Sequence, residues 1–327
     1  MINKIKKPGF FLFLFLGIFI SKIALPCDPC KIFIAREAEG QMGSGYNVGI
    51  AEQFTHMGTL QNNGNAIPNL ANQYLDSSIT QFYLGYNHSD FFGVPFIGGQ
   101  LNIPLIYRTY RRPEEASIEQ GSITGLGDIS LMGNFVPINF LKDKILFQWA
   151  VHTGIKFPTG DSNPLAEELS HHDEDGPLSG IHGHDLALGS GSFDGIFGSS
   201  FYFSYKKFFI NSDIFYVLRT EGDFLYEFAD EIYWSFIPGY YLLLTSSYSL
   251  SLEMLVTGTD KGFDTLASVE DVHDTSITQV FLGPRSTLSI KNLFSITLGA
   301  EFPVINENSE IQIVPDYRFL ANITFHK

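Results

Sequence analysis

The chain has 327 residues, of which 17% are charged and 15% aromatic, and it carries a formal net charge of -15. Soluble domains average about 25% charged residues, so something other than water must face much of this surface. The acidic balance argues against a nucleic-acid partner, because such partners select basic surfaces.

The first 26 residues form a separate unit. Lysines at three of the first seven positions precede an apolar run at 10–20, and the small residues Ser21 and Ala24 follow it. The run is too short to span a bilayer as a helix, so we predict a cleaved secretory signal peptide over residues 1–26, with an uncleaved anchor as the alternative. No later stretch is long and apolar enough for a spanning helix. Two classes remain, a soluble secreted all-β protein and an outer-membrane barrel.

Cys27 and Cys30 are the only two cysteines and stand just after the predicted cleavage region. An oxidising compartment favours a small disulfide between them. Lys31 follows Cys30, so the haem-attachment motif, which needs a histidine there, is not met. We predict that residues 27–44 form an N-terminal lead-in or a plug in the lumen, and that residues 45–327 form one barrel domain.

Residues after position 44 alternate between apolar and polar in one segment after another. Between 248 and 257, for example, Leu252 and Met254 share one face, and Ser251 and Glu253 share the other. This period of two predicts strands with one apolar and one polar face. Most of the predicted strands exceed the usual length of about 5–6 residues and are long enough to cross a membrane. The twelve predicted strands cover 45–58, 76–88, 95–110, 123–136, 144–157, 186–205, 207–220, 225–243, 248–258, 275–288, 292–303 and 312–326.

The connections between these strands alternate in length. Those after the even-numbered strands are short, whereas most of the others are long. The long ones are 59–75, 111–122, 158–185, 259–274 and 304–311, with 221–224 as the exception. A membrane barrel with short turns on one side and long loops on the other predicts this parity, and a sandwich does not. We therefore predict an all-β fold, a transmembrane antiparallel β-barrel of about 12 strands in the outer membrane of a Gram-negative-type bacterium.

Three Gly-rich stretches follow one another in the middle of the chain. They are Gly-Leu-Gly-Asp-Ile-Ser-Leu at 125–131, Gly-Ile-Lys-Phe-Pro-Thr-Gly at 154–160 and Leu-Gly-Ser-Gly-Ser at 188–192. In order and spacing, apart from a long insertion at 161–185, they resemble the outer-membrane channel family named for the meta-pathway of phenol degradation. The resemblance covers the fourth to sixth predicted strands, and the rest of the chain only by pattern. It implies transport of small, often aromatic, compounds.

The segment 171–185 contains four of the nine histidines together with several carboxylates. The predicted topology places it in a loop on the outer side. Imidazoles with nearby carboxylates suit Zn or Cu, and His-rich tracts often bind metal by composition alone. We hypothesise weak Zn or Cu binding there and expect no other cofactor, with a solvated polar loop as the alternative. The candidate ligands are His171, His172, Asp173, Asp175, His182, His184 and Asp185.

Ionisable residues on the polar faces of the predicted strands form a second candidate group. Such residues line pores and tune selectivity. A network of them also fills the interior of closed barrels with about eight strands, so an open pore and a filled lumen both stay open as alternatives. The residues are Arg108, Lys156, Asp213, Arg219, Glu253, Glu301 and Arg318.

These features favour a channel or transporter for small aromatic or hydrophobic molecules. It would lie in the lipid bilayer after insertion by the outer-membrane assembly machinery. A metal-capturing barrel that uses the loop 171–185 is the first alternative, and a structural barrel without transport is the second. We do not expect an enzyme, because the one adjacent trio of hydrolase type, Asn87-His88-Ser89, stands near a predicted inner turn, away from outer-leaflet lipid.

Overall fold

The computed structural model describes residues 44–91, 94–114, 117–169, 179–267, 270–290 and 293–327. The predicted signal peptide, the Cys27–Cys30 pair, residues 27–43 of the predicted lead-in and residues 171–178 of the His-rich segment lie outside them.

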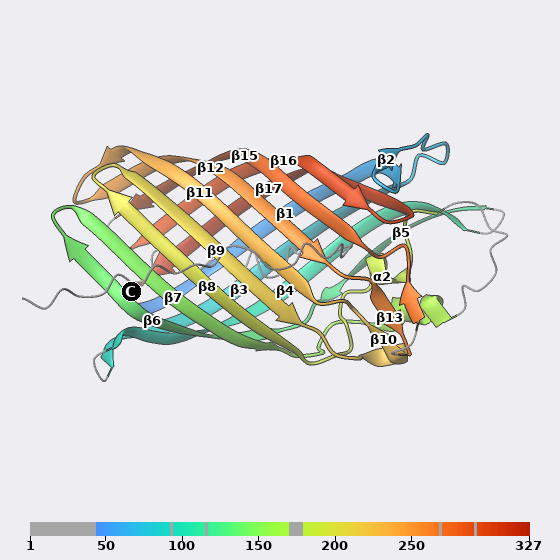
Figure 1. Ribbon diagram of the computed structural model, residues 1–327, viewed down its shortest axis with the longest axis horizontal. Coiled ribbons are helices and arrows are strands. Elements are labelled where there is room, and N and C mark those ends of the chain that lie inside the picture. The colour runs from blue at the N-terminus through green and yellow to red at the C-terminus, as the bar shows by residue number, and fades with distance from the viewer. Residues whose placement is uncertain (1–43, 92–93, 115–116, 170–178, 268–269, 291–292) are drawn as a thin grey trace, which may run out of the picture.

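Twelve long antiparallel strands form one closed sheet (Figure 1). The strand β17 returns to β1, from Asn47 opposite His326 to Asn62 opposite Ile311, so the barrel has no open edge at this seam. Closure satisfies backbone groups that would be costly to expose to lipid. The strands are β1 (Gly45–Asn62), β3 (Tyr74–Phe91), β4 (Val94–Glu114), β6 (Ser130–Lys142), β7 (Ile145–Lys156), β8 (Asp194–Tyr205), β9 (Phe208–Leu218), β11 (Glu231–Leu244), β12 (Tyr248–Lys261), β15 (Ile277–Ile290), β16 (Phe294–Asn308) and β17 (Ile311–His326).

The wall is interrupted at one place beside β4. The second half of β4 pairs with β5 (Ser117–Leu126) and the first half with β6, so the predicted strand 123–136 is in fact parts of two strands. Because β7 ends opposite Ser130, β5 has no second partner strand among the described residues. Two other predicted starts are wrong: β8 begins at Asp194 rather than at 186, and β11 begins at Glu231 rather than at 225.

The two ends of the barrel differ. At the turn end, which holds the start of β1 and the end of β17, short turns such as 143–144 and 206–207 join consecutive strands. The loop end carries longer connections that contain short elements. Two of the segments predicted as long loops at this end are largely strands instead. Residues 111–122 are mostly a hairpin of β4 and β5, and 304–311 reduces to the turn 309–310. The short elements are β2 (Asn65–Ala66), η1 (Asn163–Leu169), α2 (Gly183–Leu186), η2 (Asp223–Leu225), β10 (Tyr226–Glu227), β13 (Asp264–Leu266) and β14 (Glu270–Val272).

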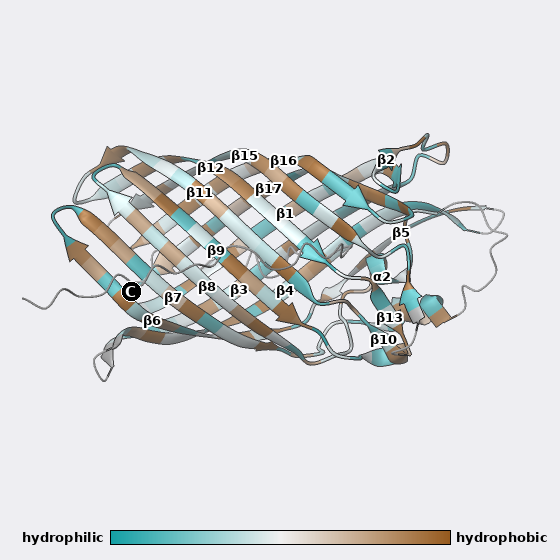
Figure 2. Cartoon of the chain, viewed as in Figure 1, coloured by the Kyte–Doolittle hydropathy of each residue, from teal (hydrophilic) through white to brown (hydrophobic). Residues whose placement is uncertain are grey.

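The outer face of the wall is apolar. Outward residues such as Leu252, Met254 and Phe319 are 53%, 48% and 51% exposed, while their strand neighbours point into the lumen and are buried. Figure 2 shows hydrophobic residues alternating with more hydrophilic ones along the strands of the barrel wall. Water-soluble monomers rarely expose a continuous apolar surface of this extent, so the wall is a lipid-facing surface. In the described part of the chain, no helix has the length and apolar character needed to cross a membrane.

Candidate functional site

The three Gly-rich motifs meet at the loop end, around the carboxylate of Asp128. Its Oδ1 accepts the backbone N–H groups of Thr159 (3.2 Å) and Gly160 (3.0 Å). Its Oδ2 accepts the N–H and the hydroxyl of Ser190 (2.9 and 3.0 Å). A Cβ atom on Gly189 would lie 2.6 Å from Oδ1, so this close approach requires glycine. Asp128 lies between β5 and β6, at the interruption in the wall, and its hydrogen bonds therefore anchor the segment that follows β7.

A chain of buried ion pairs continues from Asp128 along the loop end of the neighbouring strands. The Nζ atom of Lys156 lies between Asp128 (2.5 Å) and Asp194 (2.7 Å). The guanidinium of Arg219 lies between Asp194 (2.9 Å) and Glu231 (3.0 Å). Each cation thus has two carboxylate partners. Removing one member of such a buried set is strongly destabilising, because it leaves an uncompensated charge.

Three loops pack together over the loop end. We call their described parts the cover, which comprises residues from 157–193, 219–230 and 262–276. Leu165 and Ala187 of the first loop form a buried cluster with Tyr226 of the second. Arg108 on β4 donates hydrogen bonds to the backbone carbonyls of Asp185 (2.6 Å) and Ala187 (2.8 Å), so the lumen wall holds the cover directly. One cavity between the described parts of the cover and the wall measures about 40 Å³, room for a few water molecules.

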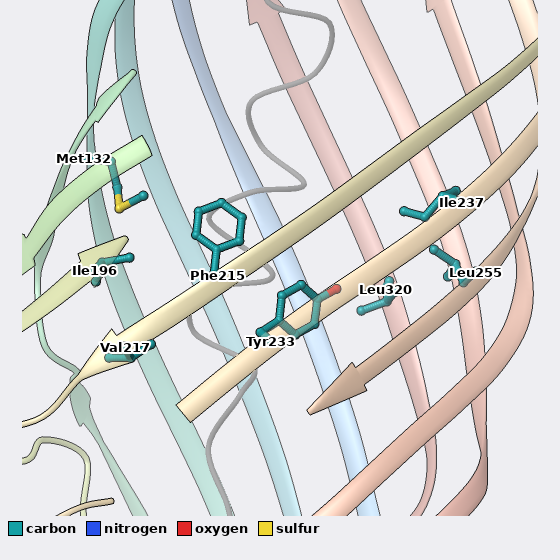
Figure 3. Close-up of a cluster of buried hydrophobic side chains, with 8 residues drawn as sticks. All are labelled: Met132, Ile196, Phe215, Val217, Tyr233, Ile237, Leu255 and Leu320. Atoms are coloured by element: carbon teal, nitrogen blue, oxygen red, sulfur yellow. The ribbon is translucent and has the colours of Figure 1, made fainter. Parts of the chain in front are cut away.

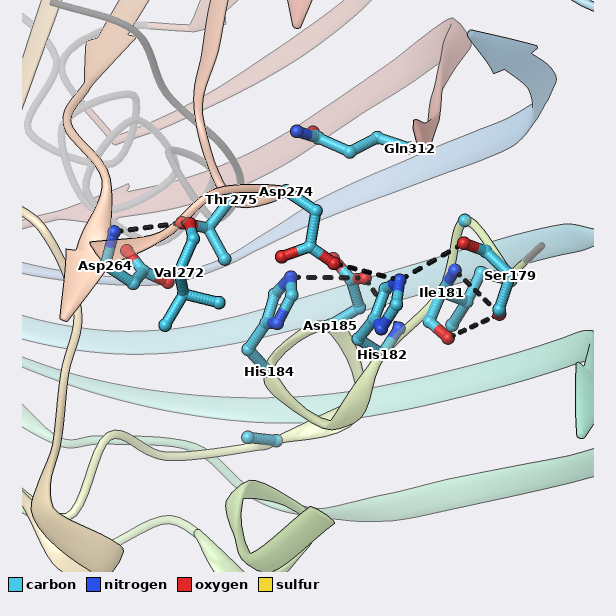
Figure 4. Close-up of polar contacts among 12 residues, drawn as sticks. Ser179, Ile181, His182, His184, Asp185, Asp264, Val272, Asp274, Thr275 and Gln312 are labelled. Atoms are coloured by element: carbon cyan, nitrogen blue, oxygen red, sulfur yellow. Dashed lines mark hydrogen bonds and ion pairs between the residues drawn. The ribbon is translucent and has the colours of Figure 1, made fainter. Parts of the chain in front are cut away.

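His184, in the helix α2 of the cover, is a buried charged group (Figure 4). Its Nδ1 lies 3.0 Å from Glu168 and its Nε2 lies 3.5 Å from Asp185. Burial favours a lower pKa for His184, but Asp185 and Glu168 outweigh it and raise the pKa to about 10. Burial likewise favours a higher pKa for Glu168, but His184 lowers it to about 2. The pair therefore stays charged at neutral pH and fastens the first loop of the cover.

The described part of the His-rich segment is not an exposed, extended loop. His182 precedes α2 and His184 lies within it, and their rings stack in parallel with centroids 5.7 Å apart. The Nε2 atom of His182 lies 3.0 Å from Asp274 (Figure 4). No group of three His, Cys, Asp or Glu side chains suited to a metal ion occurs within the described ranges. Weak Zn or Cu binding stays a prediction, because His171, His172, Asp173 and Asp175 lie outside those ranges.

All seven ionisable residues predicted to line the lumen lie on its inner side. Arg219 follows the last residue of β9 and its side chain is 11% exposed. Glu253 pairs with Arg285, and Glu301 accepts a hydrogen bond from Thr257 (2.6 Å). Their role in selectivity stays a prediction. The six that are buried within strands are Arg108, Lys156, Asp213, Glu253, Glu301 and Arg318.

The lumen wall also carries an apolar patch that the alternation pattern does not predict. Phe215 and Tyr233 are its aromatic members (Figure 3). The ring of Phe215 lies over Gly198, where a Cβ atom would approach it to 2.3 Å. Concave apolar surfaces with a few fixed polar groups are typical of small-molecule sites. We call this patch the lumen cluster, and it consists of Met132, Ile196, Phe215, Val217, Tyr233, Ile237, Leu255 and Leu320.

A serine, a histidine and an amide lie in hydrogen-bond contact on adjacent strands of the lumen wall. The Nδ1 atom of His152 lies 2.8 Å from Asn134 and its Nε2 lies 2.5 Å from Ser200. Hydrolases use a similar order of nucleophile, base and orienting group. Asp213, however, is the cross-strand neighbour of Ser200 on the same inner face, and a carboxylate there opposes a developing oxyanion. We interpret the trio as part of the hydrogen-bonded wall. The predicted trio 87–89 lies apart from it, near the turn end of β3.

The sequence patterns identify Lys156 and Arg219 but miss their partners Asp194 and Glu231. Both carboxylates stand at the first position of their strands, where the predicted boundaries are wrong. A usable signal exists for Glu231, because it is in phase with the inward-facing Tyr233.

No model of a known protein family matches the sequence, and no curated protein matches it. Among solved structures, the chain is similar to an outer membrane channel from Pseudomonas putida F1, with a TM-score of 0.57, 11% identity, and coverage of 87% of this chain and 96% of that one. The β domain of the Bordetella autotransporter BrkA has a TM-score of 0.45, 10% identity and coverage of 86% and 99%. The CymD monoaromatic hydrocarbon channel has a TM-score of 0.40, 7% identity and coverage of 89% and 92%. The first similarity confirms the predicted fold class: a closed antiparallel barrel of the outer-membrane type.

Proposed function

We propose that the protein is an outer-membrane channel for small molecules with an apolar or aromatic body. One observation carries the proposal: a closed barrel with a lipid-facing exterior has, in its lumen, an apolar cluster beside fixed charges. An apolar body gains contact area at such a wall, and the charges orient its polar group. Short turns of bacterial barrels face the periplasm, so the loop end and its cover face the outside.

The cover gives the channel a defined barrier. Arg108 and Asp128 attach the first loop to the wall at two separate points. Cargo arriving from the outside meets this loop before it reaches the lumen cluster. Passage therefore depends on displacement of the cover. The P. putida protein is described as a channel, and channel activity rather than enzyme activity is what we extend to this chain.

Single-channel recording in planar bilayers tests the proposal. Wild-type protein is expected to give small, discrete current steps. Arg108→Gln is expected to give larger or longer openings, because two hydrogen bonds to the cover are lost. Arg111→Gln is the matched control, since Arg111 on the same strand lies on the opposite face and donates instead to the carbonyl of Ala71. Folded barrels that stay silent in all three forms would contradict the proposal and favour a structural role.

A further inference from the structure

Arg318 is a buried cation whose hydrogen-bond donors are only partly satisfied. It lies on the lumen face of β17 and is 5% exposed. Its guanidinium carbon lies 3.7 Å above the centre of the Phe281 ring, and its Nη2 donates one long hydrogen bond of 3.3 Å to Gln279. Among the described residues its Nε has no hydrogen-bond partner. A buried, charged donor without an acceptor is unfavourable unless another group satisfies it.

Three other cations of the lumen are held by carboxylates, and Arg108 is held by backbone carbonyls. Lys156 and Arg219 each lie between two carboxylates, and Arg285 is paired with Glu253. Arg219 also has an unpartnered Nε, but both of its terminal nitrogens are in ion pairs. Across the residues that the structure describes, no carboxylate lies within ion-pair distance of Arg318. Arg318 therefore combines an unpartnered Nε with the lack of a described carboxylate at ion-pair distance, and its cross-strand neighbour Glu301 acts on it only from farther away.

Two apolar side chains of the lumen face lie on the turn-end side of Arg318, beyond which the Glu253–Arg285 pair follows. Leu320 is the next inward residue on β17 and belongs to the lumen cluster, as does Leu255 (Figure 3). The ring of Phe281 lies under the guanidinium, and the Nε edge beside it is buried and unpartnered among the described residues. A planar guanidinium edge binds a carboxylate through two parallel hydrogen bonds. Apolar side chains beside that edge favour a carboxylate attached to a hydrophobic ring.

We propose that Arg318 and the lumen cluster form a binding site for small aromatic monocarboxylates. The site rests on the proposed channel function and names its cargo class. The carboxylate occupies the Nε edge of Arg318, and the ring packs against Leu320 and Leu255. The lumen charge beside the site limits the cargo to one negative charge, since Glu301 is the cross-strand neighbour of Arg318.

A substitution of Glu301 tests the site, because it is expected to change the affinity for a carboxylate in a known direction. One of its oxygens accepts a hydrogen bond from Thr257, so the carboxylate is fixed on the same inner face as Arg318. Its charge repels an incoming carboxylate. Glu301→Gln removes that charge and is expected to tighten binding, whereas Arg318→Gln is expected to weaken it. A site that merely tolerates hydrophobic molecules would respond to neither change.

Isothermal titration of detergent-solubilised full-length protein with benzoate tests the proposal. We expect Arg318→Gln to raise the Kd about tenfold to a hundredfold, as the loss of a charge-assisted pair of hydrogen bonds implies. Arg111→Gln, the same charge change outside the lumen, is expected to leave the Kd unchanged. Benzyl alcohol, which has the ring but no charge, is expected to bind wild type and Arg318→Gln equally. Terephthalate, with two charges, is expected to bind more weakly than benzoate.

Two results would overturn the site: benzoate bound equally by wild type and Arg318→Gln, or benzyl alcohol bound as tightly as benzoate by wild type. If Arg318→Gln does not fold, Arg318→Lys keeps the charge but loses the planar edge, and it is expected to weaken benzoate binding alone. Bilayer recordings separate this site from the channel function. Conductance without benzoate block contradicts only the site, and benzoate binding to a silent barrel contradicts only the channel.

Discussion

The loop end and the middle of the lumen use buried charge in different ways. At the loop end, Lys156 and Arg219 each contact two carboxylates, and Asp128 accepts hydrogen bonds from two further segments. In the middle of the lumen, Arg318 has one long hydrogen bond and an aromatic support. A saturated set of charges fixes a structure, because any departure leaves a buried charge exposed to low dielectric. An unsaturated charge leaves binding capacity for a ligand.

This difference assigns two functions to two regions: the loop end keeps the channel closed, and the middle of the lumen selects the cargo. The cover is attached by the saturated set, so changes there should act on the stability of the closed state. The lumen cluster lies beside the unsaturated cation, so changes there should act on which molecules bind. Substitutions in one region are therefore expected to leave the property of the other region nearly intact.

The largest expected effect comes from Asp128→Ala. The substitution leaves Lys156 with one carboxylate and removes the acceptor for Gly160 and Ser190. We expect a loss of about 3–5 kcal/mol in the free energy of unfolding in micelles, measured by urea titration, together with larger bilayer currents. Asp271→Ala, at an exposed position of β14, is the control and is expected to cost less than about 0.5 kcal/mol. Equal stability of the two variants would mean that Asp128 does not hold the cover.

The second prediction concerns pH. The pKa of His184 is raised from 6.5 to about 10, so its contribution is complete below pH 6.5 and is lost as the pH rises toward 10. The pKa of Glu168 is lowered from 4.5 to about 2, so its contribution is complete above pH 4.5 and is lost as the pH falls toward 2. The free energy that favours the closed cover is expected to fall by up to about 1.4 kcal/mol per pH unit above pH 6.5.

Open probability in bilayer recordings from pH 4 to 10 measures this dependence. Wild type is expected to open progressively above neutral pH. The His184→Gln variant is expected to have a higher open probability than wild type at every pH below 10. Its open probability is expected not to rise with pH. A rise that persists in His184→Gln would assign the pH dependence to another group, and the ion pair with Glu168 would then not control the cover.

A smaller effect is expected from packing in the lumen cluster. Gly198→Ala places a Cβ atom 2.3 Å from the present position of the Phe215 ring, so the ring must move. We expect a cost of about 1–3 kcal/mol and weaker binding of both benzoate and benzyl alcohol. Gly133→Ala is the matched control, because its Cβ atom would find its nearest neighbour at 3.5 Å, an ordinary contact. Unchanged binding by Gly198→Ala would exclude Phe215 from the cargo site.

The sequence predicts the barrel better than it predicts what closes and lines it. Period-two alternation places Glu253 and Arg318 inward correctly, because each strand has one lipid face and one lumen face. The same rule misses Leu255 and Leu320, since an apolar residue on an inward face gives no contrast with its lipid-facing neighbours. The ion pairs of Asp194 bring together separate strands and depend on register, which composition and spacing do not fix.

The smallest expected effect concerns metal binding by the His-rich segment. Within the described residues, His182 and His184 already contact Asp274 and Glu168, so a metal ion would compete with these ion pairs. Calorimetric titration with Zn or Cu is therefore expected to show weak binding that is lost when His171, His172, His182 and His184 are changed to Ala. His56→Ala is the control, since His56 also lies beside carboxylates, Asp76 and Asp316, on the outer wall. Binding that survives the fourfold change but not His56→Ala would move the metal site to the wall. Binding that survives both would eliminate both histidine groups as ligands, and the ion pairs of His182 and His184 would then be unaffected by the metal.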